Sequence, residues 1–300
     1  MRAALRVLDP GALTLIEDLG RPGHAAAGVP TGGAADRPAL RLGNRLVGNL
    51  DGAAGLETLL GGLTLRALTP VRMAVTGAPA PVTIDDRPVS FGAAVPVAAG
   101  ATVRVGRPVV GLRTYVTVAG GVVAPTVYGS AAASPSLGVG PAPLRAGDDV
   151  AVGYAARSPG FALPLAIADP LEAGSTWAQA PPARVVLGPR ADWFTPEAVR
   201  ALIGTTWRAS TDIDRIGVRL SGPLLTRAPE RVGAELASEP MTRGAIQVPP
   251  DGIPIVLLAD HPTTGGYPVI GVILDADTDR LAQLRPGDPV RFDLTASPFE

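Results

Sequence analysis

A loop near the N-terminus carries an acid and a base at close spacing. Glu17-Asp-Leu-Gly-Arg-Pro-Gly23 follows an apolar stretch and places Asp18 three residues before Arg21, where Gly20 and Gly23 permit tight backbone. An arginine guanidinium can hold a carboxylate or a carbamate through two parallel hydrogen bonds, so this loop could bind such a group. The alternative is a structural Asp18–Arg21 ion pair that closes the loop, and the local sequence favours this alternative.

The densest polar cluster lies in Ala259-Asp-His-Pro-Thr-Thr-Gly-Gly-Tyr267, directly after a short apolar stretch. Polar residues at the end of a buried strand are a common way to build a site on a rigid scaffold. Asp260, Thr264 and Tyr267 are therefore candidates, together with Gln247, which precedes the same stretch. A turn-rich hairpin capped by Thr and Asp is the alternative, and we favour the functional interpretation.

A third set lies at the end of a predicted helix and the start of the strand that follows it. Asn44 and Asn49 are the only asparagines of the chain, and Glu57 comes shortly after them. An asparagine can donate to a substrate carbonyl and accept from an N–H, although Asn49 also fits a helix C-cap. Glu57 could act as a general base, but an ion pair with a nearby arginine is the simpler interpretation.

The Gly-rich stretch from Gly28 to Asp36 leads into the same predicted helix. Backbone N–H groups at a helix start can hold an oxyanion. The stretch lacks the pattern of a nucleotide-binding loop, and Asp36 is most simply the N-cap of the helix.

The composition excludes several chemistries. All 26 basic residues are Arg, Cys is absent, and only His24 and His261 are present. Without Lys the chain can form no Schiff base, carry no biotin as an amide and build no Walker A motif. Without Cys it has no thiolate or disulfide, and two His make a metal centre unfavourable, so no metal is expected.

Charge and hydropathy indicate a cytoplasmic protein that binds neither nucleic acid nor membrane. The formal net charge is −1 with scattered Arg, so there is no basic surface of the kind that binds nucleic acid. No apolar segment approaches the roughly 18 residues that span a bilayer, and the N-terminal residues lack the apolar core of a secretory signal.

Short, Val-, Leu- and Thr-rich segments separated by turns predict a mainly β protein with a few short helices, built as barrels or sandwiches. Gly and Pro together make up 69 of the 300 residues. Helices are predicted over 36–47, 196–203 and 277–284, with Thr195 as a cap of the second. The predicted strands are Leu13–Ile16, Thr64–Leu68, Arg72–Thr76, Val82–Ile84, Thr102–Val105, Tyr115–Val118, Val185–Leu187, Gly217–Leu220, Ile255–Leu258 and Val269–Ile273.

A weak internal repeat indicates two similar halves. Leu144-Arg-Ala-Gly-Asp-Asp-Val150 corresponds to Leu284-Arg-Pro-Gly-Asp-Pro-Val290, and other matches occur in the same order. The stretch between the halves is rich in Pro and lacks periodicity. We predict one domain over 1–155, a Pro-rich linker over 156–183 and a second domain over 184–300.

Several motifs occur together in order. Examples are Asp-Leu-Gly-Arg-Pro-Gly (18–23), Gly-Val-Pro-Thr-Gly-Gly-Ala-Ala-Asp (28–36), Asp-Arg-Ile-Gly-Val-Arg-Leu-Ser-Gly-Pro (214–223) and Leu-Ala-Asp-His-Pro-Thr-Thr-Gly-Gly-Tyr-Pro (258–268). The set resembles the biotin-dependent carboxyltransferase family of KipA, the C subunit of 5-oxoprolinase and allophanate hydrolase subunit 2, over essentially the whole chain. The segment Tyr128–Ser134 departs from that family, which puts the choice of substrate in doubt more than the fold.

The resemblance implies two tandem cyclophilin-like β-barrel domains and a role as one subunit of an ATP-dependent 5-oxoprolinase, which opens 5-oxo-L-proline to L-glutamate. It implies a partner like KipI or the B subunit of 5-oxoprolinase, and a LamB/YcsF-like A subunit. ATP would act through the complex, and biotin could be carried only on a partner chain. The alternatives are a carboxyltransferase that moves CO₂ from carboxybiotin to a urea-like amide, and a KipA-type regulatory partner without catalysis.

Residues that match the family motifs form the predicted site. Asp18, Arg21, Glu57 and Asp260 are the catalytic candidates, and the predicted substrate is a small amide or lactam. Its candidate ligands are Asn44, Asn49, Gln247, Thr264 and Tyr267.

Overall fold

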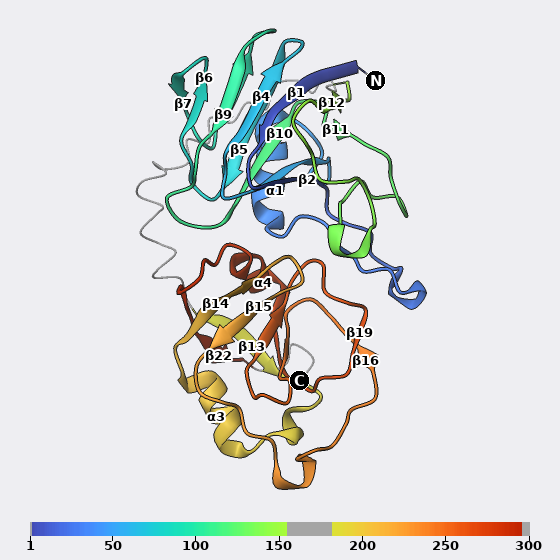
Figure 1. Ribbon diagram of the computed structural model, residues 1–300, viewed down its shortest axis with the longest axis vertical. Helices are drawn as coiled ribbons and strands as arrows, with labels where there is room; N and C mark the ends of the chain where they lie inside the picture. The colour runs from blue at the N-terminus through green and yellow to red at the C-terminus, as the bar shows by residue number, and fades with distance from the viewer. Residues whose placement is uncertain (1, 155–181, 296–300) are drawn as a thin grey trace. The chain divides into compact units, whose positions relative to one another are not determined.

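The computed structural model describes residues 2–154 and 182–295 (Figure 1). The described residues form two compact units, the first made of residues 2–21 and 32–154 and the second of residues 22–31 and 182–295. The predicted Pro-rich linker over 156–183 lies outside the described residues except for its last two positions. The two units are therefore described separately.

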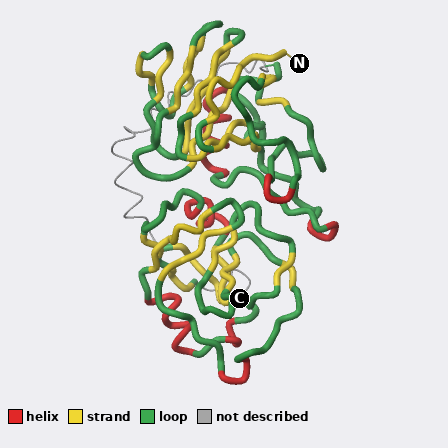
Figure 2. The backbone as a smooth tube through the Cα atoms, in the orientation of Figure 1, coloured by secondary structure: helices red, strands yellow, loops and turns green. Residues whose placement is uncertain are grey.

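The predicted mainly β fold class is confirmed (Figure 2), with three α-helices in the described part of the chain. Each predicted strand coincides wholly or largely with an observed one. The prediction succeeded because short alternating segments bury every second side chain: in β4 (Leu63–Ala67), Leu63, Leu65 and Ala67 are buried, whereas Arg66 is exposed.

The first unit encloses its core between two sheets of antiparallel strands. A seven-stranded sheet has the order β11-β12-β1-β4-β9-β6-β7, and a five-stranded sheet has the order β2-β3-β10-β5-β8. Core residues come from both, for example Leu65 and Val103 from the first sheet and Met73 and Val116 from the second. The strands other than β4 are β1 (Arg2–Pro10), β2 (Leu13–Glu17), β3 (Gly55–Leu59), β5 (Val71–Gly77), β6 (Val82–Ile84), β7 (Arg87–Val89), β8 (Ala94–Val97), β9 (Thr102–Val105), β10 (Arg113–Val118), β11 (Val122–Val123) and β12 (Asp149–Val152), and one 3-10 turn, η2, covers Pro135–Leu137.

Helix α1 (Arg37–Val47) packs on β5 and β10 and confirms the first helix prediction. The Asp36 side chain caps it by accepting from the Ala39 N–H at 3.1 Å, and Gly48 ends it in the left-handed region. A Cβ at Gly43 would lie 2.8 Å from the Thr117 hydroxyl oxygen, so this glycine lets the helix approach the sheet closely.

The second unit is built on one sheet of eight strands in the order β21-β14-β15-β18-β17-β20-β13-β22. Its two outermost strands are separated in the chain by Arg291 alone, so the sheet curls into a nearly closed barrel. The strands are β13 (Ala183–Leu187), β14 (Trp207–Ile213), β15 (Gly217–Ser221), β17 (Ala245–Gln247), β18 (Ile255–Leu257), β20 (Val269–Ile273), β21 (Pro289–Val290) and β22 (Phe292–Leu294), with a separate pair of β16 (Glu239–Pro240) and β19 (Thr264–Gly265). Short 3-10 turns cover Ala25–Ala27 (η1), Ala191–Trp193 (η3) and Pro229–Arg231 (η4).

The two helices of this unit test the remaining helix predictions. Helix α3 (Pro196–Gly204) is confirmed, with the Thr195 hydroxyl capping the Ala198 N–H at 3.2 Å. Helix α4 (Asp275–Leu281) begins two residues before the predicted start and ends three residues before the predicted end. Asp277 therefore lies inside the first turn, where its carboxylate accepts from the Arg184 backbone N–H at 2.9 Å, a long-range bond that sequence could not reveal.

The repeated Leu-Arg-x-Gly-Asp segment forms the same turn in both units. The Asp148 carboxylate accepts from the Arg145 N–H at 2.7 Å, and the Asp288 carboxylate accepts from the Arg285 N–H at 2.8 Å. Each following strand pairs antiparallel with a long strand of its own unit, β12 with β1 and β21 with β14. The sequence repeat therefore corresponds to a structural repeat.

Candidate functional site

The start of α1 is held by a buried carboxylate and a buried phenol. Strands β3 and β10 pair so that Glu57 lies opposite Tyr115. The Tyr115 hydroxyl donates to Glu57 Oε2 at 2.6 Å, and the Ala35 N–H donates to the same oxygen at 2.9 Å. The Asp36 N–H in turn donates to the Tyr115 hydroxyl at 2.8 Å. The backbone donors of the Gly-rich loop thus bind groups of the protein itself, with Glu57 as the anion.

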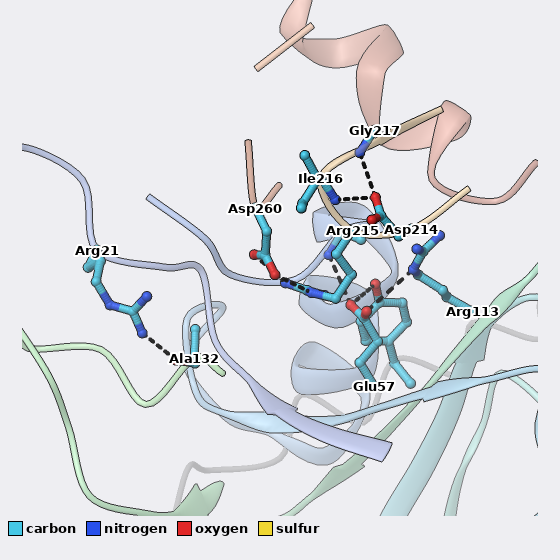
Figure 3. A network of polar contacts seen from close by, with 11 residues as sticks. Arg21, Glu57, Arg113, Ala132, Asp214, Arg215, Ile216, Gly217 and Asp260 are labelled. Atoms are coloured by element: carbon cyan, nitrogen blue, oxygen red, sulfur yellow. Dashed lines mark hydrogen bonds and ion pairs between the residues drawn. The ribbon is translucent and has the colours of Figure 1, made fainter. Parts of the chain in front are cut away.

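Charge in this cluster is partly neutralised by Arg113. Its Nε lies 3.4 Å from Glu57 Oε1, and the two side chains are only 3% and 4% exposed (Figure 3). Burial, followed by the negative charges of Glu57 and Asp36, raises the pKa of Tyr115 well above its usual range. Tyr115 therefore stays a neutral donor at ordinary pH. The ion-pair interpretation of Glu57 agrees with this geometry.

Asp18 and Arg21 do not pair with each other, but both bind the loop that follows β11. The Asp18 carboxylate accepts from the Ser130 hydroxyl at 2.6 Å and from the Ala131 N–H at 2.7 Å. The Arg21 guanidinium donates to the Val127 carbonyl and, as Figure 3 shows, to the Ala132 carbonyl. This loop contains the segment that departs from the family motifs, so the departure lies against two predicted catalytic residues.

Arg21 is buried and has no acidic partner in the described part of the chain. Its residue is 1% exposed, and its Nη1 atom has no hydrogen-bond partner among the described residues. A buried guanidinium bound only to carbonyls holds two loops together, and in this conformation it is closed to a substrate carboxylate.

Loop 18–21 lies beside the start of α1. The Ala34 N–H donates to the Asp18 carbonyl at 2.8 Å. Gly33 has a positive φ of 88°, and a Cβ there would lie 2.6 Å from the Gly20 nitrogen. The fold thereby brings Asp18, Arg21 and Glu57 into one region of the first unit.

Asn44 and Asn49 connect the end of α1 to neighbouring backbone. Asn44 Nδ2 donates to the Ala53 carbonyl at 2.7 Å, and Asn49 Nδ2 donates to the Val118 carbonyl at 2.8 Å and to Asn44 Oδ1 at 3.0 Å. The Gly120 N–H donates to Asn49 Oδ1 at 2.7 Å. These bonds use the same groups that a substrate amide would need.

In the second unit, Asp260 forms a buried, two-point ion pair with Arg215. Arg215 Nε lies 2.9 Å from Asp260 Oδ2 and Arg215 Nη2 lies 3.1 Å from Asp260 Oδ1 (Figure 3). The residues are 8% and 2% exposed. Beside them, His261 is buried with Nδ1 2.8 Å from the Pro262 carbonyl, and burial is the main cause that lowers the pKa of His261.

The other predicted residues of the second unit lie around the β16–β19 pair. Gln247 is buried, and its Nε2 donates to Met241 Sδ at 3.1 Å and to the Tyr267 carbonyl at 3.4 Å. Thr264 is exposed within β19, and Tyr267 is 45% exposed. Thr264 and Tyr267 are thus the predicted ligands with side chains open to solvent.

Sequence reasoning did not place Tyr115, Arg113 or Arg215 in the site. Tyr115 was predicted only as a strand residue, and its role depends on the pairing of β3 with β10. Arg215 stands in the Asp-Arg-Ile-Gly motif, which was a usable signal, but its partner lies 45 positions later.

Two features of the described residues concern metal and phosphate binding. The described residues contain no group of three or more His, Cys, Asp or Glu side chains that could hold a metal ion. At the start of α1, the Ala35 and Asp36 N–H groups are taken by Glu57 and Tyr115. Within the same part of the chain, no helix has the length and apolar character to cross a membrane.

Comparison with known proteins adds independent evidence. Residues 27–294 match the family described as carboxyltransferase domain, subdomain A and B. The chain is 36% identical over 295 residues to the C subunit of 5-oxoprolinase from Escherichia coli, covering 96% of this chain and 90% of that protein.

Two solved structures share the fold. One is the crystal structure of TTHA0988, whose sequence is 34% identical to this chain and whose fold matches it with a TM-score of 0.84. The match covers 97% of this chain but only 55% of that chain. The crystal structure of urea amidolyase from K. lactis is 28% identical with a TM-score of 0.85, and the match covers 98% of this chain and 19% of that enzyme. This chain thus corresponds to one part of each longer protein.

Proposed function

Since the chain belongs to the carboxyltransferase domain family, subdomain A and B, we propose that it is the C subunit of a 5-oxoprolinase complex, a multi-subunit hydrolase. The observation that carries this proposal is the agreement in length with the E. coli protein, of which 90% is covered at 36% identity. In urea amidolyase the same region is 19% of the chain. The complex would open 5-oxo-L-proline to L-glutamate with ATP, in the cytoplasm.

We assign the substrate contacts to the exposed residues of the second unit. A lactam has a carbonyl oxygen that accepts a hydrogen bond and an N–H that donates one. The hydroxyls of Thr264 and Tyr267 can serve both, because each is a donor and an acceptor. Gln247 contacts the Tyr267 carbonyl and supports this loop. Substrate binding by Asn44 and Asn49 stays a prediction, and their bonds support a structural role.

The buried candidates position the loops of their own unit. Asp18 and Arg21 fasten loop 18–21 to residues 127–132, and Glu57 holds the start of α1. Asp260 fixes the beginning of the loop that carries Thr264 through its pair with Arg215. These residues restrict the motion of site loops, which lowers the entropic cost of orienting a substrate.

ATP and biotin belong to partner chains in this proposal. The chain has no Lys to carry biotin, and the N–H groups at the start of α1 are already engaged. A KipI-type protein, like the B subunit of 5-oxoprolinase, and a LamB/YcsF-like A subunit would therefore supply the nucleotide chemistry. This chain's part is to bind and orient the amide.

The test is an ATP-dependent 5-oxoprolinase assay of the co-expressed subunits. Thr264→Ala and Tyr267→Phe should each lower kcat/KM about tenfold, the effect of losing one hydrogen bond of about 1.4 kcal/mol. Thr211→Ala, at an exposed position of β14, is the matched control and should leave turnover unchanged. Absent or ATP-independent turnover by the wild-type complex contradicts the proposal.

A second candidate is a carboxyltransferase acting on a urea-like amide, favoured by the TM-score of 0.85 against urea amidolyase. It predicts carboxyl transfer to urea when a carboxybiotin-carrying partner is supplied, and no 5-oxoproline opening. A KipA-type regulator would bind its KipI-like partner and support neither reaction.

A further inference from the structure

The first unit contains a cavity at the opposite end of α1 from Glu57. It has a volume of about 540 Å³ and is lined by residues of β1, β5 and β12 and of the adjoining loops. Small-molecule sites in proteins have volumes of about 300–1,000 Å³. Helix α1 has 11 residues, so the two regions lie roughly 16 Å apart along its axis. The cavity is therefore separate from the region of Asp18, Arg21 and Glu57, and it lies near the end of α1 that is followed by Asn49.

The walls of this cavity are mostly apolar and made of small residues. Ala4, Ala119 and Gly153 line it without any side chain beyond Cβ, which leaves the space unfilled. Val71 and Val152 add branched apolar surface. Such walls favour a compact apolar body over a polar one.

The lining residues include one cation, Arg72, which is exposed to solvent. Arg72 lines the cavity, and its Nη2 donates to the carbonyl of Val47, the last residue of α1, at 2.5 Å. No carboxylate of the described chain pairs with Arg72. A guanidinium has five N–H donors, so Arg72 can keep the helix bond and still offer donors to a ligand.

The surroundings of Arg72 decide the charge of that ligand. The lining includes no acidic residue, so the carboxylate of a ligand would meet no side chain of like charge among the lining residues. However, the C-terminus of α1 presents the negative end of the helix dipole next to Arg72. A single carboxylate is favoured, whereas a polyphosphate would face one cation and several carbonyls.

We propose that this cavity binds a compact monocarboxylate with an apolar body. The carboxylate lies against Arg72 and the apolar body against Val71 and Val152. Thr69 and Tyr154, which also line the cavity, can bind a polar substituent of the ligand. Because Tyr154 is 94% exposed, the cavity reaches solvent and is accessible to a small molecule. The proposal does not depend on the proposed function.

The proposal is tested by measuring the binding of cyclopentanecarboxylate to the full chain with ligand-observed NMR and calorimetry. Cyclopentanecarboxamide, which has the same ring but no charge, is the control compound. The carboxylate should bind at least about tenfold more tightly than the amide, because a charge-assisted bond replaces a neutral one. Equal binding of the two compounds, or no binding of the carboxylate at millimolar concentration, overturns the proposal.

Variants locate the site. Arg72→Gln should abolish the preference for the carboxylate, whereas Arg87→Gln, an exposed arginine of the same unit without an acidic partner among the described residues, should retain it. Ala119→Leu fills the cavity while keeping Arg72, and it should remove binding of both compounds. Thermal unfolding checks that each variant is folded. Unchanged carboxylate affinity in folded Arg72→Gln or in Ala119→Leu contradicts the site.

Discussion

The two units bury a carboxylate in different ways. In the first unit, Glu57 is held by the Ala35 N–H and the Tyr115 hydroxyl at the start of a helix, with Arg113 at 3.4 Å. In the second unit, Asp260 is held by both ends of the Arg215 guanidinium. The first arrangement divides the stabilisation between two neutral donors and a more distant arginine, whereas the second concentrates it in one two-point ion pair.

This difference has an energetic consequence. Removing one partner of a buried ion pair leaves the other charge without compensation, which is among the most destabilising single changes. Removing one neutral donor costs the desolvation of a single polar group. The Asp260–Arg215 pair should therefore be more sensitive to a single substitution than the Tyr115 donor is.

The largest effect is expected for Asp260→Ala. It leaves the buried Arg215 guanidinium without its carboxylate and should destabilise the second unit by about 3–5 kcal/mol in urea unfolding. The double variant Arg215→Met, Asp260→Leu should recover much of this loss, because it removes both charges of the pair. A loss below about 1 kcal/mol for Asp260→Ala would show that the pair is not the main support of this loop.

Tyr115→Phe should have a smaller effect. It removes a donor to Glu57 and the acceptor of the Asp36 N–H, and it should cost about 1–3 kcal/mol. Tyr154→Phe, at an exposed position, is the control and should unfold like the wild type. If Tyr115→Phe destabilises the protein as much as Asp260→Ala does, the contrast between the two units fails.

Asp36→Ala tests how much of the first arrangement depends on the helix cap. Loss of the bond to the Ala39 N–H should cost about 0.5–2 kcal/mol in thermal unfolding. Asp36→Asn retains a capping side chain and should restore most of the stability. Equal losses in the two variants would indicate that the charge of Asp36, rather than its capping bond, stabilises α1.

The smallest effect concerns His261, beside the ion pair. Burial, opposed by the Pro262 carbonyl and the Asp260 charge and reinforced by Arg243, lowers the pKa of His261 from 6.5. Below pH 6.5 the unfolded chain therefore binds a proton that the folded chain does not, and stability falls as the pH falls towards the folded pKa.

His261→Gln should remove this contribution, which cannot exceed about 1.4 kcal/mol per pH unit for one proton. The measurement is urea unfolding of the variant and the wild type between pH 5 and 7 (roughly the range in which His titrates). A wild-type curve no steeper than that of the variant contradicts the prediction.

Much of the fold was predictable because the signals are local. Leu63-Thr-Leu-Arg-Ala67 alternates as a half-buried strand does, and Asp36 with Pro38 marks the start of α1. The repeated Leu-Arg-x-Gly-Asp turn holds itself by an Asp-to-backbone bond across three residues in each half. Each of these features depends on neighbours within one turn or strand.

The candidate site was predictable only in part. Family motifs identified Asp18, Arg21, Glu57 and Asp260 as residues of interest, but their partners lie far away in sequence. The bonds from Asp18 and Arg21 reach residues more than 100 positions later. The Asp18–Arg21 pair favoured locally does not form, because loop 127–132 offers each side chain complementary backbone groups.

The sequence by itself determined the elements of this protein and the chemistries that it cannot perform, because composition, alternation and capping are properties of neighbouring residues. The tertiary structure alone decided that Glu57 meets Tyr115 and that Asp260 meets Arg215. Those contacts follow from strand register and loop packing, where a shift of one residue would turn each side chain to the opposite face.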